Sequence, residues 1–219
     1  MPPRRGFFIT LEGPEGSGKS SQGRWLARRL QRAGYAVACV RDPGSTALGR
    51  ALRRVLLHQA GAWSPLTEAL LFIGGRVQLV EERIRPALAQ GQVVVCDRFH
   101  DATVAYQGFG GGLDVRWLDR LGRSALQGVM PGLTILLDLP TAQGFARLRH
   151  SRDRMERKSR AFHQRVRRGY LQLAARESGR FAVIDASQPF PRVRRHIERR
   201  VLQALCQRRP GKPLSRQNR

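Results

Sequence analysis

Short runs of consecutive apolar residues alternate along this chain with longer segments in which apolar residues recur every three or four positions. The short runs are rich in β-branched and aromatic residues, which is typical of strands buried on both faces of a parallel sheet. The pattern predicts five such strands, at Gly6–Leu11, Ala36–Val40, Val93–Cys96, Leu133–Leu139 and Phe181–Asp185.

The longer segments have the apolar spacing of amphipathic helices and lie between the predicted strands. Strands that alternate with helices predict an α/β fold, a doubly wound five-stranded parallel sheet flanked by helices, with ligands at the carboxyl ends of the strands. The glycine-rich stretch Gly108–Gly112 is expected to be a flexible loop. Helices are predicted over Ser21–Ala33, Ala47–His58, Pro65–Gln90, Val115–Leu126, Thr141–Arg149, a basic segment ending near Glu177, and Pro189–Cys206.

The alternation has no repeat and no long linker, so residues 1–207 are predicted to form a single domain with a basic, disordered tail at 208–219. A hydrophobic content of 41% is enough for a sizeable core. No stretch approaches the roughly 20 apolar residues of a membrane span, and we expect no cleavable signal peptide before the first strand. Cys39 and Cys96 lie in apolar runs, where we expect small buried residues of a reducing, cytoplasmic protein.

The balance of charge is strongly basic, with 40 Lys and Arg against 16 Asp and Glu, a net charge of +24. Such a charge favours either nucleic acid or phosphate-rich small molecules as partners. The cations are spread along the chain without the interleaved aromatic residues that stack on bases. We therefore expect weak nucleic-acid binding at low salt but no specific nucleic-acid partner, and no membrane partner.

The first predicted strand runs directly into the sequence GPEGSGKS, which matches the phosphate-binding P-loop G-x-x-x-x-G-K-[ST]. In this motif backbone N–H groups surround phosphate oxygens, the lysine reaches the β- and γ-phosphates, and the Ser hydroxyl ligates Mg²⁺. The strand before the loop and the helix after it are the context that the motif needs. The predicted ATP-binding residues are Gly13, Pro14, Glu15, Gly16, Ser17, Gly18, Lys19 and Ser20, with Lys19 also catalytic.

The third predicted strand ends in Asp97-Arg98, whereas P-loop motors and switches usually continue with Asp-Glu or Asp-x-x-Gly. The aspartate is placed to hold Mg²⁺ together with Ser20. An arginine beside it suggests that a second phosphate must be held, and therefore transfer from one phosphate to another. A nucleic-acid-dependent NTPase remains an alternative because of the charge, although it should carry a catalytic glutamate after this strand.

At this point the chain resembles the thymidylate kinase family. The matching segments are LEGPEGSGKS, RDPGST, LLFIGGRVQLVEERIRPAL, DRFHDATVAYQG and DRMERKSRAFHQRVRRGYLQLA, which occur in the family's order and extend over Phe7–Ala204. The resemblance implies a homodimeric, Mg²⁺-dependent enzyme that transfers the γ-phosphoryl of ATP to dTMP, giving dTDP and ADP for dTTP synthesis. Another pyrimidine nucleotide as acceptor remains the nearest alternative.

The resemblance also implies roles for individual residues at the acceptor site. Glu15 would accept a hydrogen bond from the 3′-hydroxyl, and Phe72 would stack on the thymine ring. Arg76 would donate to the carbonyl O4, which excludes the amino group of cytosine. The remaining acceptor residues are the phosphate ligands Arg41, Arg53 and Arg98, the base-edge contacts Thr103 and Gln107, and Tyr106 beneath the deoxyribose. For Arg53, a solvated helix face is the alternative.

Gly16 occupies the P-loop position at which one branch of this family carries its catalytic arginine. The other branch supplies arginines from a lid over ATP, and the basic segment at about 147–158 resembles that lid. We therefore expect catalytic roles for Arg98 and for the lid residues Arg149, Arg152 and Arg154. Asp42, Ser45, Gly75 and Ala102 depart from the family pattern near the acceptor site, so base selectivity is the property we expect them to affect.

Overall fold

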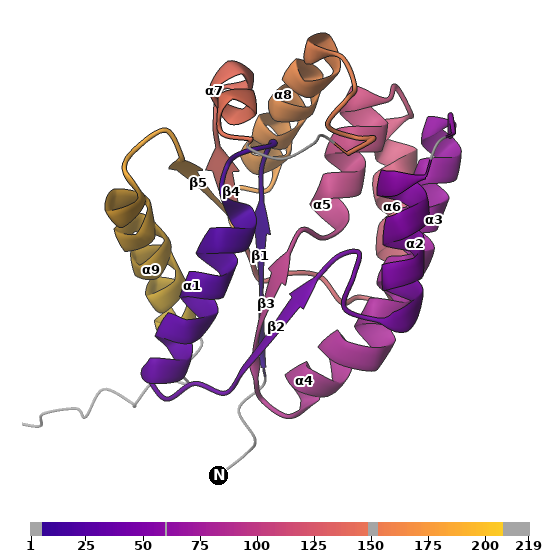
Figure 1. Cartoon of the computed structure of the whole chain (residues 1–219). Coiled ribbons are helices and arrows are strands. Elements are labelled where there is room, and N and C mark those ends of the chain that lie inside the picture. Colours follow the sequence, from indigo (N-terminus) through magenta and orange to yellow (C-terminus); the bar gives the residue numbers. More distant parts are fainter. Residues whose placement is uncertain (1–5, 60, 149–152, 208–219) are drawn as a thin grey trace, which may run out of the picture.

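The computed structural model describes residues 6–59, 61–148 and 153–207, and its centre is a five-stranded parallel sheet (Figure 1). The strand order is β2-β3-β1-β4-β5, and every neighbouring pair is parallel. This confirms the predicted fold class. The strands are β1 (Phe7–Glu12), β2 (Val37–Arg41), β3 (Val93–Asp97), β4 (Leu133–Asp138) and β5 (Phe181–Asp185), within one or two residues of the predicted ranges.

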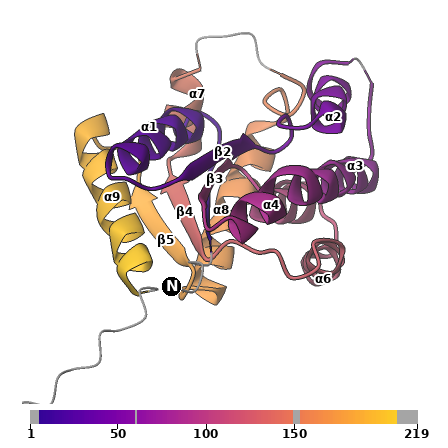
Figure 2. The same cartoon turned by 90° about the horizontal axis from the view of Figure 1, so that it is seen from below.

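Helices cover both faces of the sheet, as the view from below shows (Figure 2). Helices α1 (Lys19–Arg32) and α9 (Phe190–Gln207) cover one face, where Ile9 and Leu11 of β1 pack with Leu26 and Ile197. Phe8, directly before Ile9 in sequence, packs on the opposite face, because successive side chains of a strand point to opposite sides. That face is covered by α4 (Arg85–Ala89), by α8 (Arg160–Arg176) and by the end of α3 (Pro65–Leu79).

The predicted helix over Pro65–Gln90 is present but changes its winding on the way. Between α3 and α4 lies a π-helical turn, η1 (Val80–Ile84). Pro86 lies in the first turn of α4 and has no backbone N–H to continue the α-helical hydrogen bonding. The wider turn just before this proline accommodates the missing donor.

The segment after β3 differs from the sequence prediction. It forms α5 (His100–Thr103) and a π-helical turn, η2 (Val104–Gly110), where no helix was predicted. The predicted loop at Gly108–Gly112 is therefore wrong for its first half. A Cβ on Gly110 would lie 2.7 Å from the Phe162 ring, so the glycine serves close packing of η2 against α8.

Two of the remaining helices begin after a residue whose side chain accepts a hydrogen bond from the first helical turn. Helix α2 (Ala47–His58) begins after Thr46, whose hydroxyl accepts a hydrogen bond from Gly49 N. Helix α6 (Val115–Ala125) begins in the same way after Asp114. Helix α7 (Thr141–Ala146) is shorter than the predicted Thr141–Arg149. The predicted tail at 208–219 lies outside the described residues, as does part of the predicted lid, at 149–152.

All three cysteines are free, and their environments differ. Cys96 is fully buried in the central strand β3, as predicted. The prediction is wrong for Cys39, which is exposed because β2 is an edge strand of the sheet. Within the described part of the chain, no helix combines the length and the apolar character needed to cross a membrane.

Candidate functional site

A large cavity of about 1050 Å³ opens at the carboxyl ends of β1, β2 and β3. Its wall combines the P-loop, the end of α5 and the middle of η2, helices α2 and α3, and the loop between β5 and α9. The sequence-predicted residues that line it are Glu15, Gly16, Ser17, Gly18, Lys19, Ser20, Arg41, Arg53, Phe72, Arg76, Asp97, Arg98, Thr103, Tyr106 and Gln107. The chain therefore brings residues from five separate segments to one site.

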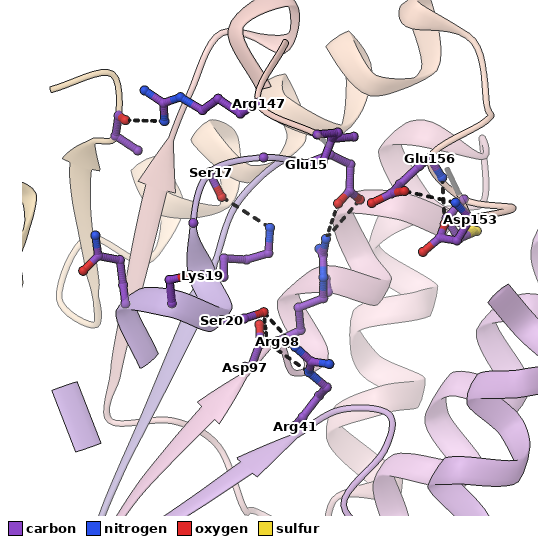
Figure 3. Close-up of a pocket in the computed structure, with 18 of the residues that line it drawn as sticks. Glu15, Ser17, Lys19, Ser20, Arg41, Asp97, Arg98, Arg147, Asp153 and Glu156 are labelled. Carbon is purple, nitrogen blue, oxygen red and sulfur yellow. Dashed lines mark hydrogen bonds and ion pairs between the residues drawn. The ribbon is translucent and has the colours of Figure 1, made fainter. Parts of the chain in front are cut away.

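At the P-loop end of the cavity, Lys19 is buried and folds back over its own loop (Figure 3). Its Nζ donates to Pro14 O at 2.7 Å and to Ser17 Oγ at 3.3 Å. Burial, and then the charge of Arg98, lowers the pKa of Lys19 to about 8. An ammonium group held by two neutral oxygens is well placed to exchange them for phosphate oxygens.

Two oxygen ligands lie together beside this lysine. The Ser20 hydroxyl donates to Asp97 Oδ2 at 2.5 Å, and Arg41 Nη2 donates to Ser20 at 2.8 Å and pairs with Asp97 at 3.1 Å. Burial raises the pKa of Asp97, but the Ser20 hydrogen bond and the charge of Lys19 outweigh it, so this pKa lies below its ordinary value. The described residues contain no cluster of three or more His, Cys, Asp or Glu side chains for a metal ion. A hydroxyl and one carboxylate nevertheless suit Mg²⁺, which takes most of its other ligands from phosphates and water.

Glu15 and Arg98 face each other across the middle of the site (Figure 3). Arg98 Nη2 donates to both carboxylate oxygens of Glu15 at 3.0 Å, and Tyr106 Oη donates to Oε1 at 2.5 Å. Burial raises the pKa of Glu15, but the charges of Arg98 and Lys19 outweigh it and lower this pKa to about 2. The carboxylate is therefore charged and able to accept hydrogen bonds at any physiological pH.

Arg98 owes its direction to an uncommon backbone conformation, with φ at 67° directly after β3. Glu12, at the end of β1, holds this turn from below: its Oε1 accepts from Phe99 N at 2.6 Å and its Oε2 from Tyr170 Oη at 2.8 Å. Burial, and then the charge of Asp101, raises the pKa of Glu12 to about 8. The sequence prediction gave Glu12 no role.

At the other end of the cavity, Arg76 is only 2% exposed and two of its three nitrogens are in use. Nε donates to Asp42, and Nη2 donates to Thr103 Oγ1 at 2.9 Å. Nη1 is buried without a hydrogen-bond partner, although Arg76 lines the cavity. A buried guanidinium donor without a partner is costly, so this nitrogen is expected to meet an acceptor on a ligand.

The two neighbouring arginines of α2 have different environments. Arg53 lines the cavity and donates from Nη1 to Pro43 O at 3.3 Å, whereas Arg54 is exposed. Burial lowers the pKa of Arg53 below its ordinary value, as does the nearby charge of Arg41. The arrangement therefore favours a ligand role for Arg53 over a solvated helix face.

The predicted lid is described only in part. Arg149 and Arg152 lie outside the described residues. Arg154 does not line the cavity: its Nη1 donates to Glu68 at 2.6 Å and its Nε to Leu56 O at 2.7 Å. In this structure the buried carboxylate of Glu68 holds the guanidinium beside α3, and the expected catalytic role of Arg154 stays a prediction.

Arg147 was within the predicted lid but was not one of its candidate residues. Its Nη1 donates to Ala186 O at 2.9 Å, next to the loop between β5 and α9 (Figure 3). This loop lines the donor end of the cavity. The sequence could have indicated this loop as part of the site, because it follows a predicted strand and ligands of such sheets bind at the strand ends.

Comparison with known proteins agrees with this geometry. Residues 11–197 match the family model described as thymidylate kinase. The chain belongs to the thymidylate kinase family. A thymidylate kinase of Synechococcus sp. (strain JA-2-3B'a(2-13)) is 51% identical over 82% of this chain and 86% of that protein. The thymidylate kinase of Deinococcus radiodurans is 48% identical over 84% of this chain and 91% of that protein.

A solved structure of a thymidylate kinase from Ehrlichia chaffeensis has a similar fold, with a TM-score of 0.73 and 33% sequence identity. The match covers 90% of this chain and 98% of that one. The sequence analysis did not single out two buried glutamates near the site. Glu12 lies below the turn of Arg98, and Glu68 lies behind the cavity wall. Both are buried carboxylates, which sequence patterns do not distinguish from exposed ones.

Proposed function

We propose that this chain transfers the γ-phosphoryl group of ATP to dTMP, giving dTDP and ADP. The observation that carries the proposal is the layout of one cavity. The P-loop residue Lys19 lies at one end, an unpaired guanidinium nitrogen of Arg76 at the other, and further arginine side chains line the cavity between them. That order matches a triphosphate, an acceptor phosphate and a pyrimidine base placed in line.

The donor end would bind the triphosphate through the backbone N–H groups of the P-loop and the side chain of Lys19. Ser20 and Asp97 are the residues that would hold Mg²⁺, and Arg41 would release their oxygens to do so. When bound, this ion supplies positive charge that neutralises the phosphate oxygens and orients them.

The acceptor end would hold the dTMP phosphate with Arg41, Arg53 and Arg98. The base would stack on Phe72, and its O4 would accept from the free Nη1 of Arg76. The other proposed contacts are Thr103 and Gln107 on the base edge, Glu15 with the 3′-hydroxyl, and Tyr106 beneath the deoxyribose, where it crowds a 2′-hydroxyl.

The reaction needs no general base, because the attacking oxygen belongs to a phosphate that is already anionic at pH 7. The chain's task is to align two polyanions and to neutralise them. Lys19 and Arg98 supply charge from the described part of the site, and Arg149 and Arg152 are proposed to supply more from the lid. A lid over the site would also exclude water, which would otherwise accept the phosphoryl group.

We also propose a homodimer acting in the cytoplasm. Helix α3 packs against α2 and α6, and the exposed apolar side chains on these helices include Leu48, Leu66, Leu70 and Trp117. Leu70 is 50% exposed, which is a high value for a leucine in the middle of a helix. A second copy of the same face would cover these side chains.

The test is an ADP-release assay with dTMP, dUMP, dCMP and thymidine as acceptors. We expect the highest kcat/KM for dTMP and no turnover in Lys19→Ala, a variant whose thermal unfolding should remain close to that of the wild type. A preference for another monophosphate would replace the acceptor in the proposal. ATP hydrolysis stimulated by DNA or RNA, without transfer to any monophosphate, would favour the nucleic-acid-dependent alternative.

A further inference from the structure

Glu68 of α3 is a buried carboxylate that lies behind the cavity wall rather than on it. It accepts hydrogen bonds from three side chains that come from two distant parts of the chain. Gln107 Nε2 donates to Oε2 at 2.9 Å, and Arg154 Nη1 donates to Oε1 at 2.6 Å. Lys158 Nζ lies 2.9 and 3.0 Å from the two oxygens. One carboxylate thus joins the acceptor site to the described end of the predicted lid, at 153–158.

This contact determines which way the amide of Gln107 points. Burial raises the pKa of Glu68, but hydrogen bonds from Gln107, Lys158 and Arg154 outweigh it, so this pKa lies below its ordinary value. A charged carboxylate can only accept hydrogen bonds, so the amide NH₂ must face Glu68. The carbonyl Oε1 is then left without a hydrogen bond among the described residues, on a side chain that lines the cavity.

The direction of this amide matters for the choice of base. With NH₂ held by Glu68, Gln107 offers an acceptor to the cavity, while Arg76 offers its free donor Nη1. A thymine or uracil edge presents the complementary pair, a donor at N3–H and an acceptor at O4. Cytosine presents an acceptor and a donor at these positions, so both contacts would be mismatched.

The same carboxylate also holds the segment 153–158, which precedes α8. Arg154 is bound to Glu68 and to Leu56 O, and its own backbone N–H donates to Leu57 O at 3.0 Å. The neighbours of Arg154, Asp153 and Met155, line the cavity. The position of this wall therefore depends on the ion pairs with Glu68.

We propose that Glu68 is a positioning residue that couples the reading of the pyrimidine edge to the placement of the cavity wall at 153–158. It fixes the Gln107 amide as an acceptor and, through Arg154 and Lys158, anchors this wall. The proposal rests on the proposed function, because it takes a pyrimidine monophosphate as the occupant of the acceptor site.

The first experiment replaces Glu68 by Gln, which keeps the shape but can donate as well as accept. The Gln107 amide can then turn, so the ratio of kcat/KM for dTMP to that for dCMP should fall about tenfold or more, the worth of one mismatched hydrogen bond. Glu68→Asp keeps the charge, so its ratio of kcat/KM for dTMP to that for dCMP should stay closer to the wild-type value than the ratio of Glu68→Gln. The matched control is Glu82→Gln, which changes an exposed glutamate that also binds a glutamine, Gln78, and should leave the ratio unchanged.

The second experiment measures the coupling to the cavity wall at 153–158 as dTDP formed per ATP consumed, because a misplaced wall would admit water as a competing acceptor. Lys158→Met should lower this yield but leave the base ratio intact, because Arg154 still holds Glu68. In the Glu68→Gln background, Lys158→Met should have almost no further effect, since its anchor is already gone.

Each result decides one step. An unchanged base ratio in Glu68→Gln, with dTMP and dCMP declining in parallel, would show that Glu68 only supports the fold. Additive losses of yield in the double variant would show that Lys158 acts without Glu68. A wild-type protein that does not phosphorylate dTMP would instead overturn the proposed function.

Discussion

The backbones of Gly16 in the P-loop and Gly144 in α7 are in direct contact. A Cβ on Gly16 would collide with the carbonyl oxygen of Gly144 and would lie 2.7 Å from its carbonyl carbon. Gly16 also has φ at +69°, a conformation that L side chains rarely adopt. No side chain fits at this position while α7 stays where it is.

An arginine introduced at position 16 should therefore not restore a catalytic guanidinium to this loop. We expect even Gly16→Ala to lower kcat/KM at least about tenfold, because the left-handed conformation alone costs about 1–2 kcal/mol and the collision adds to it. Gly34→Ala is the control, since Gly34 has φ at +83° but nothing within 4 Å of its Cβ position. Steady-state kinetics and thermal unfolding of both variants test this, and full activity of Gly16→Ala would show that α7 yields easily.

The buried Lys19 predicts how ATP binding depends on pH. In the free protein this pKa is about 8, and bound phosphates should raise it because they favour the charged form. Below pH 8 the lysine is already protonated, whereas above it ATP binding must take up a proton. We expect kcat/KM for ATP to fall up to about tenfold per pH unit above pH 8. Calorimetry of ATP binding in two buffers of different ionisation enthalpy should detect the proton that Lys19 takes up. A value of kcat/KM for ATP that stays constant up to pH 9.5 would contradict the assignment of Lys19 as the titrating phosphate ligand.

Arg76 is expected to set the choice of base, but its ion pair complicates the test. Arg76→Ala alone would leave the buried carboxyl of Asp42 without its ion-pair partner, and breaking a buried pair in this way typically costs about 3–5 kcal/mol of stability. The double variant Arg76→Met with Asp42→Asn removes both charges. We expect it to lower kcat/KM for dTMP by roughly 10–10³-fold and that for dCMP much less. Equal losses with the two substrates would mean that Arg76 is only structural.

The sequence predicts the strands well because each is a short apolar run, and the sheet buries the inner strands β1, β3 and β4 on both faces. The sequence also predicts that the candidate site residues gather at the strand ends, where the cavity lies. It misses α5 and η2 because the segment His100–Gly110 is rich in glycine and has no clear apolar period, and tertiary packing against α8 determines its conformation. Local pattern cannot show which carboxylate will be buried, so Glu12 and Glu68 were also missed.

Glu12 should make the free energy of unfolding depend on pH. Its pKa is near 4.5 in an unfolded chain and about 8 in the folded protein. Between these values the folded state holds the extra proton, so stability should fall as pH rises, by at most about 1.4 kcal/mol per pH unit for one group. Glu12→Gln has no proton to lose and should reduce this slope.

The measurement for Glu12 is urea unfolding at several values between pH 5 and pH 8. Glu81→Gln, at an exposed glutamate, is the control and should keep the wild-type slope. Equal slopes in wild type and Glu12→Gln would show that another group carries the titration.

The lid arginines should separate into two groups by kinetics. Arg149→Ala with Arg152→Ala should reduce the single-turnover rate at saturating ATP and dTMP by about 10³–10⁵-fold, the usual effect of losing arginines that meet the transferring phosphoryl group. The dTMP KM should change little, because such contacts form only in the transition state. Lysine at these positions should substitute poorly for a planar guanidinium.

Arg154→Ala should behave differently, because Arg154 is bound to Glu68 and Leu56 O instead of facing the cavity. Its replacement should have a much smaller effect on the chemical step and should mainly lower the yield of dTDP per ATP consumed. If Arg154→Ala instead slows single turnover as much as the double variant does, its ion pair with Glu68 must open during the reaction. The catalytic charge would then come from Arg154 after all, and the lid segment would have to swing away from α3 before each transfer.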